Sequence, residues 1–154
     1  MKAYLACYNG LQLAMWVNIL ALLLYYNQKA AYLVPLIRTL CTSSHFLMSL
    51  EPVHSFLKIA NTSPIPSLIQ VSARNVFIWG YLELKADTEY AYALLLAWSL
   101  AEIIRYTYYF SGTIGTIPYL FTWLRYSSFI VLYVTGVFVE ILVCYEAVNS
   151  FITY

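Results

Sequence analysis

Residues 123–140, WLRYSSFIVLYVTGVFVE, have the length and composition of one apolar helix, yet they include ionisable side chains. Placing a charged side chain at the centre of a bilayer costs about 2.5–3.5 kcal/mol on insertion scales. Glu140 is the most demanding of these side chains, because no basic residue follows Arg125 in the chain. Its partner must come from another helix, or its carboxyl must be protonated. We therefore expect the rest of the chain to form a helical bundle around this segment.

The composition is typical of a membrane protein. The chain has 154 residues, of which 62% are hydrophobic and 10% are charged, whereas soluble domains carry about 25% charged residues. Residues 3–28 contain no charge at all, and about 20 apolar residues are enough to cross a bilayer as a helix. The net charge of +1 offers no basic surface for a phosphate backbone, so we expect no nucleic-acid partner.

The apolar segments predict an all-α, polytopic transmembrane bundle with about five spans, in a single integral membrane domain over residues 1–154. The predicted helices cover residues 3–28, 40–60, 68–84, 90–110 and the chain from 119 onward. Pro52 should kink the second helix. Pro35 should break any helix over residues 30–37, which we expect to form a loop or an amphipathic interfacial segment. Predicted loops lie at 61–67 (NTSPIPS), 85–89 (KADTE) and 111–118 (SGTIGTIP).

Several ionisable side chains fall within these apolar segments, which suggests a shared polar interior. Pairing between helices is the simplest explanation, for example Glu102 with Arg74 or with Arg125. Glu102 can also pair with Arg105 along its own helix, because the two are three residues apart.

A Glu-x-x-His pattern occurs once, at Glu51 and His54. Di-iron bundles use this pattern twice, together with two further Glu residues. The chain contains only two His, so we expect no metal and interpret His54 as a hydrogen-bonded bundle residue. The three cysteines show no disulfide or metal spacing, and none is followed six residues later by the Arg that a thiol-based phosphatase requires.

One face of the segment at 123–140 carries groups suited to acid–base chemistry. Tyr133 and Glu140 are seven residues apart, which is two helical turns or about 10.5 Å of rise on nearly the same face. Tyr126 lies another seven residues back, and Gly136 leaves a notch between the two groups. A phenol and a carboxyl beside a notch could hold an elongated ligand and act on neighbouring atoms, although glycines also serve helix packing in membranes.

The sequence resembles the 3-hydroxyacyl-CoA dehydratase family, also called protein tyrosine phosphatase-like, which serves very-long-chain fatty acid elongation. The resemblance covers most of the chain, beginning with YLACYNG in the first predicted helix. Its further blocks are LEPVHSFLKI at 50–59, QVSAR at 70–74, AWSLAEIIRYTYYF at 97–110 and WLRYSSFIVLYVTGVFVE at 123–140. Two departures are visible. Val134 stands where the family has Pro after the catalytic Tyr, and the chain ends 14 residues after Glu140, so we expect it to lack the last of the family's six spans.

The resemblance implies a multi-pass enzyme of the endoplasmic reticulum membrane that needs no cofactor. It would remove water from a long-chain (3R)-3-hydroxyacyl-CoA to give a trans-2-enoyl-CoA. Tyr133 and Glu140 fall on the family's catalytic pair. As supporting or binding residues we name Tyr126, Gly136, Arg125, Glu102, Arg105, Arg74, His54 and Glu51. Membrane lipid and the other elongation-cycle enzymes are the further expected partners.

The sequence leaves open which catalytic group is the acid and which is the base. Glu140 could remove the C2 proton while Tyr133 protonates the leaving hydroxyl, or the two could exchange these roles with Tyr133 ionised beside Arg105 or Arg125. Two alternatives from other classes also remain: a non-catalytic, truncated or divergent relative that acts as a scaffold for elongation enzymes, and a small transporter with Glu140 as its proton site.

Overall fold

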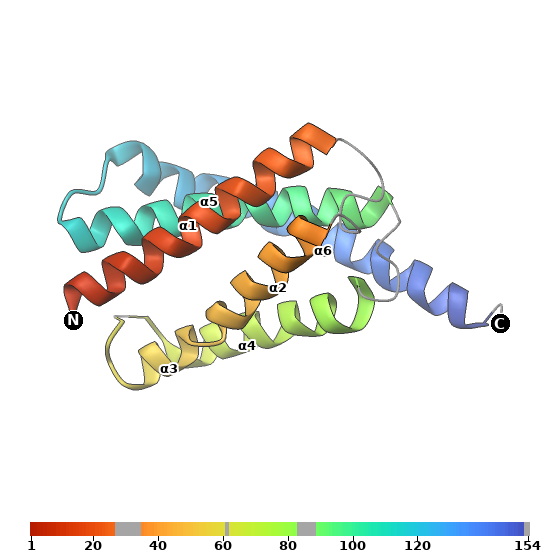
Figure 1. The fold of residues 1–154 in the computed structure, drawn as a ribbon, viewed down its shortest axis with the longest axis horizontal. Helices are drawn as coiled ribbons and strands as arrows, with labels where there is room; N and C mark the ends of the chain where they lie inside the picture. The colour runs from red at the N-terminus through yellow and green to blue at the C-terminus, as the bar shows by residue number, and fades with distance from the viewer. Residues whose placement is uncertain (27–34, 61, 83–88, 153–154) are drawn as a thin grey trace.

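The described chain is built of helices, which confirms the predicted all-α class. The computed structural model describes residues 1–26, 35–60, 62–82 and 89–152, and these ranges contain no strand. In chain order the elements are α1 (Lys2–Tyr26), α2 (Pro35–Met48), α3 (Glu51–Phe56), α4 (Pro64–Val76), the π-helical turn η2 (Phe77–Leu82), α5 (Glu89–Ile114) and α6 (Tyr119–Ile152) (Figure 1).

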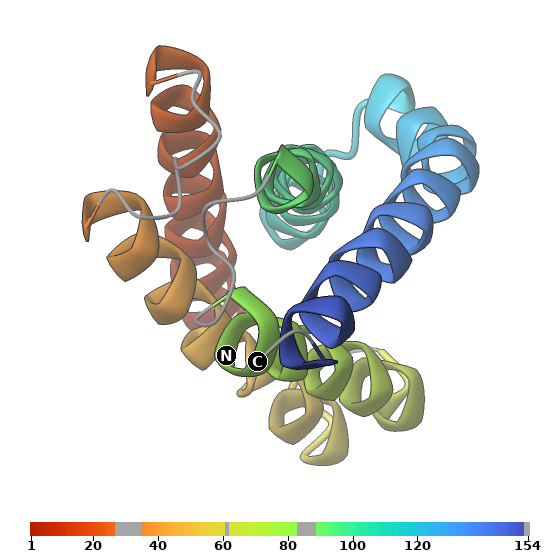
Figure 2. The same ribbon diagram turned by 90° about the vertical axis from the view of Figure 1, so that its right-hand side faces the viewer.

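Helix α5 is the central element of the bundle. It packs against α1 on one side and against α6 on the other, as the end-on view in Figure 2 shows. Helix α2 packs on α1, and α4 contacts α2 and α3. The core between α1, α2 and α5 contains fully buried large side chains such as Trp16, Leu94 and Tyr106.

The proline-containing segments differ from the sequence-based prediction. Residues 40–60 do not form one kinked helix, because the chain breaks after Met48 and resumes as α3 at Glu51. Pro35 and Pro64 begin helices α2 and α4, so the predicted irregular segments at 30–37 and 61–67 extend too far. Proline is well tolerated at the first position of a helix, where its missing N–H would have no intrahelical partner. Residues 30–34 and 85–88 lie outside the described residues.

The predicted turn at 111–118 is shorter in the structure. Helix α5 continues to Ile114 and ends where Gly115 adopts a φ of 104°. The Gly115 N–H donates to the Ser111 carbonyl at 3.0 Å, and the Thr116 N–H donates to the same oxygen at 3.2 Å. A glycine in the left-handed region commonly ends a helix in this way. This compact turn brings the start of α6 beside the end of α5.

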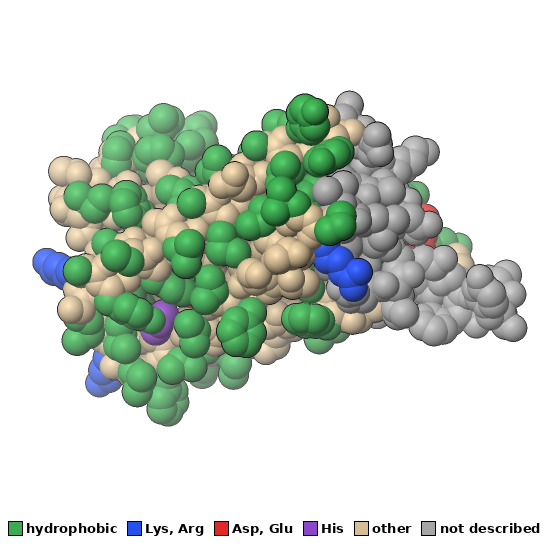
Figure 3. Space-filling model, in the orientation of Figure 1, with side chains coloured by type: hydrophobic (Ala, Val, Ile, Leu, Met, Phe, Trp, Pro, Cys, Tyr) green, Lys and Arg blue, Asp and Glu red, His purple; other side chains and the backbone are tan. Residues whose placement is uncertain are grey.

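The surface is rich in exposed apolar side chains. Phe46 is 71% exposed, Phe56 79% and Ile65 69%, and hydrophobic side chains cover much of the described face in Figure 3. Among the described residues, α1 is long and apolar enough to cross a membrane, and α6 is a second candidate if its parts Tyr119–Ser128 and Ile130–Glu146, inclined at 40°, count as one span. Large exposed apolar patches mark surfaces that contact lipid or other proteins.

Candidate active site

A cavity of about 800 Å³ lies between α4, α5 and α6. We call it the main cavity. Most of the predicted site residues line it, namely Arg74, Glu102, Arg105, Arg125, Tyr126, Tyr133, Gly136 and Glu140. Its wall also includes apolar side chains such as Ile69, Leu132 and Val137. The cavity therefore combines polar side chains from all three helices with an apolar wall that could accommodate a hydrocarbon chain.

The four residues of the predicted face of α6 line the main cavity, with Tyr126 before the bend in this helix and the other three after it. Tyr126, Tyr133, Gly136 and Glu140 all line it, because residues seven apart on a helix lie on nearly the same face. A Cβ atom added at Gly136 would meet no heavy atom within 4 Å. The predicted notch is thus open space. Helix α6 also continues through Val134, the position where the family has proline.

The carboxyl of Glu140 has a hydrogen-bond donor on α5. Trp98 Nε1–H donates to Glu140 Oε1 over 3.2 Å. Trp98 is only 2% exposed, and the Arg74 guanidinium lies 5.1 Å from the centroid of its ring. A donor thus reaches Glu140 from another helix. This donor is a neutral indole, and among the described residues no basic side chain pairs with the Glu140 carboxyl.

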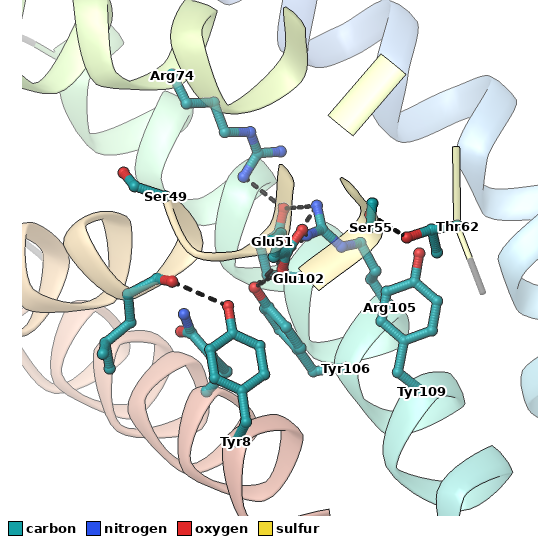
Figure 4. A network of polar contacts seen from close by, with 12 residues as sticks. Tyr8, Ser49, Glu51, Ser55, Thr62, Arg74, Glu102, Arg105, Tyr106 and Tyr109 are labelled. Atoms are coloured by element: carbon teal, nitrogen blue, oxygen red, sulfur yellow. Dashed lines mark hydrogen bonds and ion pairs between the residues drawn. The ribbon is translucent and has the colours of Figure 1, made fainter. Parts of the chain in front are cut away.

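A buried ion network joins α3, α4 and α5 (Figure 4). Arg74 Nη1 on α4 lies 2.5 Å from Glu102 Oε1 on α5, which confirms one of the two predicted interhelical pairs. Arg105 pairs with Glu102 at 3.4 Å, as its spacing predicted, and it also pairs with Glu51 of α3. The Tyr106 hydroxyl donates to the same Glu51 carboxylate. The carboxylates of this network are therefore compensated within the protein.

Arg125 has a different environment from Arg74 and Arg105. Its guanidinium lies 4.3 Å from the Tyr108 ring centroid and 4.9 Å from that of Tyr109. Its Nη2 donates to the Tyr109 hydroxyl over a long 3.5 Å. Within the described residues no carboxylate pairs with it. Arg125 thus stands beside the cavity with donors available to an oxygen atom of a ligand.

Glu51 and His54 do not line the main cavity. They line a second cavity of about 530 Å³, which we call the polar cavity. The His54 Nε2 atom and the Tyr4 hydroxyl are hydrogen-bonded at 2.8 Å, as expected for a bundle residue, while Glu51 binds Arg105 and Tyr106. In the described part of the chain, no three metal-ligating side chains come together.

The site includes residues that our sequence analysis did not select. Trp98 contacts Glu140 directly, and Gln70 and Tyr109 line both cavities. A signal was present for Trp98 and Tyr109, because together with Glu102 and Arg105 they follow a spacing of four, three and four residues. This spacing places all four on one face of a helix. Gln70 lies on α4, and its position depends on how that helix crosses α5.

Comparison with known proteins assigns the chain to a family. The sequence model described as protein tyrosine phosphatase-like protein, PTPLA, matches residues 45–154. The chain belongs to this family.

The curated relatives that it matches are named as dehydratases. A probable very-long-chain (3R)-3-hydroxyacyl-CoA dehydratase of Schizosaccharomyces pombe is 31% identical over 140 residues, covering 86% of this chain and 67% of the relative. The human very-long-chain (3R)-3-hydroxyacyl-CoA dehydratase 2 is 34% identical over 152 residues, covering 94% and 59%. The Arabidopsis thaliana dehydratase PASTICCINO 2 is 29% identical, covering 95% and 69%. The chain thus spans about three fifths to two thirds of their length. No solved structure matches it.

Proposed function

We propose that this protein is a very-long-chain (3R)-3-hydroxyacyl-CoA dehydratase that forms a trans-2-enoyl-CoA in fatty acid elongation. One observation carries the proposal: Tyr133 and Glu140 line a single cavity two helical turns apart, and Trp98 holds the carboxyl of Glu140. The names of the curated relatives and the match of the family over residues 45–154 support the same activity.

The chemistry requires an acid and a base that act on adjacent carbon atoms. A base removes a proton from C2, which the thioester carbonyl makes weakly acidic, and an acid protonates the C3 hydroxyl so that it leaves as water. In one assignment Glu140 is the base and Tyr133 the acid, and in the other their roles are exchanged. Donors such as the Arg125 guanidinium can stabilise the negative charge that develops on the thioester oxygen. Neither assignment requires a cofactor or a metal.

We also infer that the chain is a multi-pass protein of the endoplasmic reticulum membrane with about five spans. The exposed apolar side chains, including Phe46 and Phe56, support contact with lipid. An acyl chain would enter the main cavity between α4 and α6 directly from the lipid. The other elongation-cycle enzymes are the proposed partners, because they supply the substrate and consume the product.

The decisive experiment replaces each proposed catalytic group separately. We expect Tyr133→Phe and Glu140→Gln each to lower kcat for a long-chain 3-hydroxyacyl-CoA by at least about 100-fold, the lower end for a general acid or base. Formation of the enoyl product by purified protein in detergent is the measurement. Tyr145→Phe is the matched control, because Tyr145 is an exposed residue of the same helix that lines neither cavity. Near-normal turnover by either catalytic variant would refute the assignment.

A further inference from the structure

The polar cavity adjoins the main cavity and is not used by the proposed acid and base. The two cavities share the lining residues Pro66, Gln70, Arg105, Tyr109 and Arg125. The remaining wall of the polar cavity comes from α1, α3, the start of α4 and the end of α5, together with Ala60, Thr62 and Ser63 between α3 and α4. Because the shared residues belong to both walls, the two cavities lie side by side.

The two cavities follow one another along the axis of α5. On α5 the polar cavity is lined from Arg105 to Thr113, whereas the main cavity is lined from Ala97 to Tyr109. On α6 the polar cavity reaches only Arg125, near the start of the helix, and the main cavity continues to Glu140. A ligand that fills both therefore extends from the turn between α5 and α6, past Arg125, to the proposed catalytic groups.

The side chains of the polar cavity suit a neutral, hydrogen-bonding ligand. Donors and acceptors are contributed by Asn9, Ser63, Ser67, Gln70 and Thr113. The Asn9 Nδ2 bond to Thr113 Oγ1 is long, at 3.5 Å, so these groups remain able to bind a ligand. The positive charge of Arg105 is balanced by Glu51, which lines the same cavity. Arg125, at the junction with the main cavity, is the remaining charged side chain of this wall, and no carboxylate among the described residues pairs with it. Away from that junction the paired charges and the neutral side chains favour amides and hydroxyls.

We propose that the polar cavity binds the pantetheine arm of the CoA thioester. The proposal rests on the dehydratase function proposed above and adds the orientation of the substrate. The arm carries two amides and a hydroxyl on a narrow chain, which matches the neutral polar lining. Arg125 lies at the junction and donates to a carbonyl oxygen of the arm or of the thioester. The reacting carbons then lie at Tyr133 and Glu140, and the acyl chain continues along α6.

The test compares substrates that differ only in this arm. Ser67 lines the polar cavity and not the main cavity, so Ser67→Phe should fill part of the former. We expect this variant to lower kcat/KM for the CoA thioester by about tenfold or more, since each lost hydrogen bond weakens binding several-fold. The N-acetylcysteamine thioester of the same acid lacks most of the arm. Its kcat/KM should change by less than about threefold.

The control is Leu68→Phe. Leu68 is the next residue on α4, is 56% exposed and lines neither cavity, so both thioesters should react as with the unchanged protein. Binding of an unreactive thioether analogue of the acyl-CoA is measured in parallel and should weaken only in Ser67→Phe.

The outcomes separate the two proposals. Equal losses for both thioesters, or no loss for either, would overturn the assignment of the polar cavity even if Glu140→Gln is inactive. Unchanged analogue binding by Ser67→Phe would overturn it as well. Absence of turnover in the unchanged protein, with analogue binding that Ser67→Phe still weakens, would refute the dehydratase function and retain the binding site.

Discussion

Trp98 connects the proposed catalytic carboxyl to the interior of the bundle. Its indole N–H donates to Glu140, while its ring contacts the Arg74 guanidinium and lies 5.5 Å from the ring of His45. Because Trp98 is almost fully buried, the donor has a fixed position. A carboxyl that must transfer a proton gains from such fixed orientation, since small misplacements in an active site lower the rate considerably. We therefore assign Trp98 a positioning role toward Glu140.

Replacing Trp98 by Phe should remove the donor and retain most of the ring. We expect kcat to fall by about tenfold or more, because a hydrogen bond to a charged group contributes about 1.5–3 kcal/mol, while KM changes little. In a Glu140→Gln background the same substitution should have almost no further effect, since residues that act as one unit are not additive. Steady-state kinetics of the two single variants and the double variant provide the measurement.

Trp16→Phe is the matched control for Trp98→Phe. Trp16 is fully buried, and its Nε1 has no hydrogen-bond partner in the described part of the chain. This variant should lose stability as Trp98→Phe does but keep the kcat of the folded protein. A Trp98→Phe enzyme with normal kcat, or one whose loss is fully additive with that of Glu140→Gln, would contradict the positioning role.

Helix α6 places its functional groups by periodicity and leaves one position empty. Tyr126, Tyr133 and Glu140 line the main cavity at intervals of seven residues. Gly136 provides free volume between Tyr133 and Glu140. A glycine inside a helix is less favourable than alanine by about 1 kcal/mol. No close contact with a neighbouring helix requires glycine at this position. The free volume therefore fits a role in substrate binding better than a role in helix packing.

Substitutions at Gly136 should affect stability and activity in opposite directions. We expect Gly136→Ala to raise the free energy of unfolding by up to about 1 kcal/mol and to lower kcat/KM only slightly. Gly136→Leu should fill the notch and lower kcat/KM by more than about tenfold, which corresponds to 1.4 kcal/mol. Urea unfolding in detergent and the dehydration assay measure the two effects. Thr135→Leu, which changes an exposed neighbour outside both cavities, should not alter kcat/KM.

The bundle is held together by charge pairing as well as by apolar packing. Arg105 bridges Glu51 on α3 and Glu102 on α5, and Arg74 brings α4 to the same carboxylate. The side chains of Arg105 and Glu51 are 15% and 16% exposed. Removing one member of a buried ion pair leaves an uncompensated charge, and this is more harmful than removing both members.

Arg105→Leu should therefore lower the free energy of unfolding by about 3–5 kcal/mol. The double variant Glu51→Gln with Arg105→Leu should lose less, because Glu102 keeps Arg74 and no carboxylate is left unpaired on α3. Unfolding in detergent followed by tryptophan fluorescence is the measurement, with Lys2→Leu as a control that removes an exposed charge. If the double variant is less stable than Arg105→Leu, the pairing is not the source of the effect.

Local patterns predicted the parts of this molecule that depend on a single helix. The seven-residue spacing of Tyr133 and Glu140, the pairing of Glu102 with Arg105 and the start of α6 at Tyr119 all follow from helical periodicity or turn residues. The start of α4 did not, because Pro64 begins a helix although its neighbours resemble a loop. The contact of Trp98 with Glu140 and the division into two cavities depend on how α4, α5 and α6 cross. Such crossings are set by packing between distant segments.

The pairing within α5 also bears on how the chain would enter a bilayer during synthesis. Because Glu102 and Arg105 lie one turn apart and pair with each other, α5 would carry a compensating charge of its own on entering a bilayer in the multi-pass arrangement proposed above. Glu51 of α3 is synthesised earlier, and its partners Arg105 and Tyr106 both belong to α5. The segment around Glu51 would therefore remain at the interface, or insert with a protonated carboxyl, until α5 has emerged. Complete insertion of the first half of the chain would then depend on the second half.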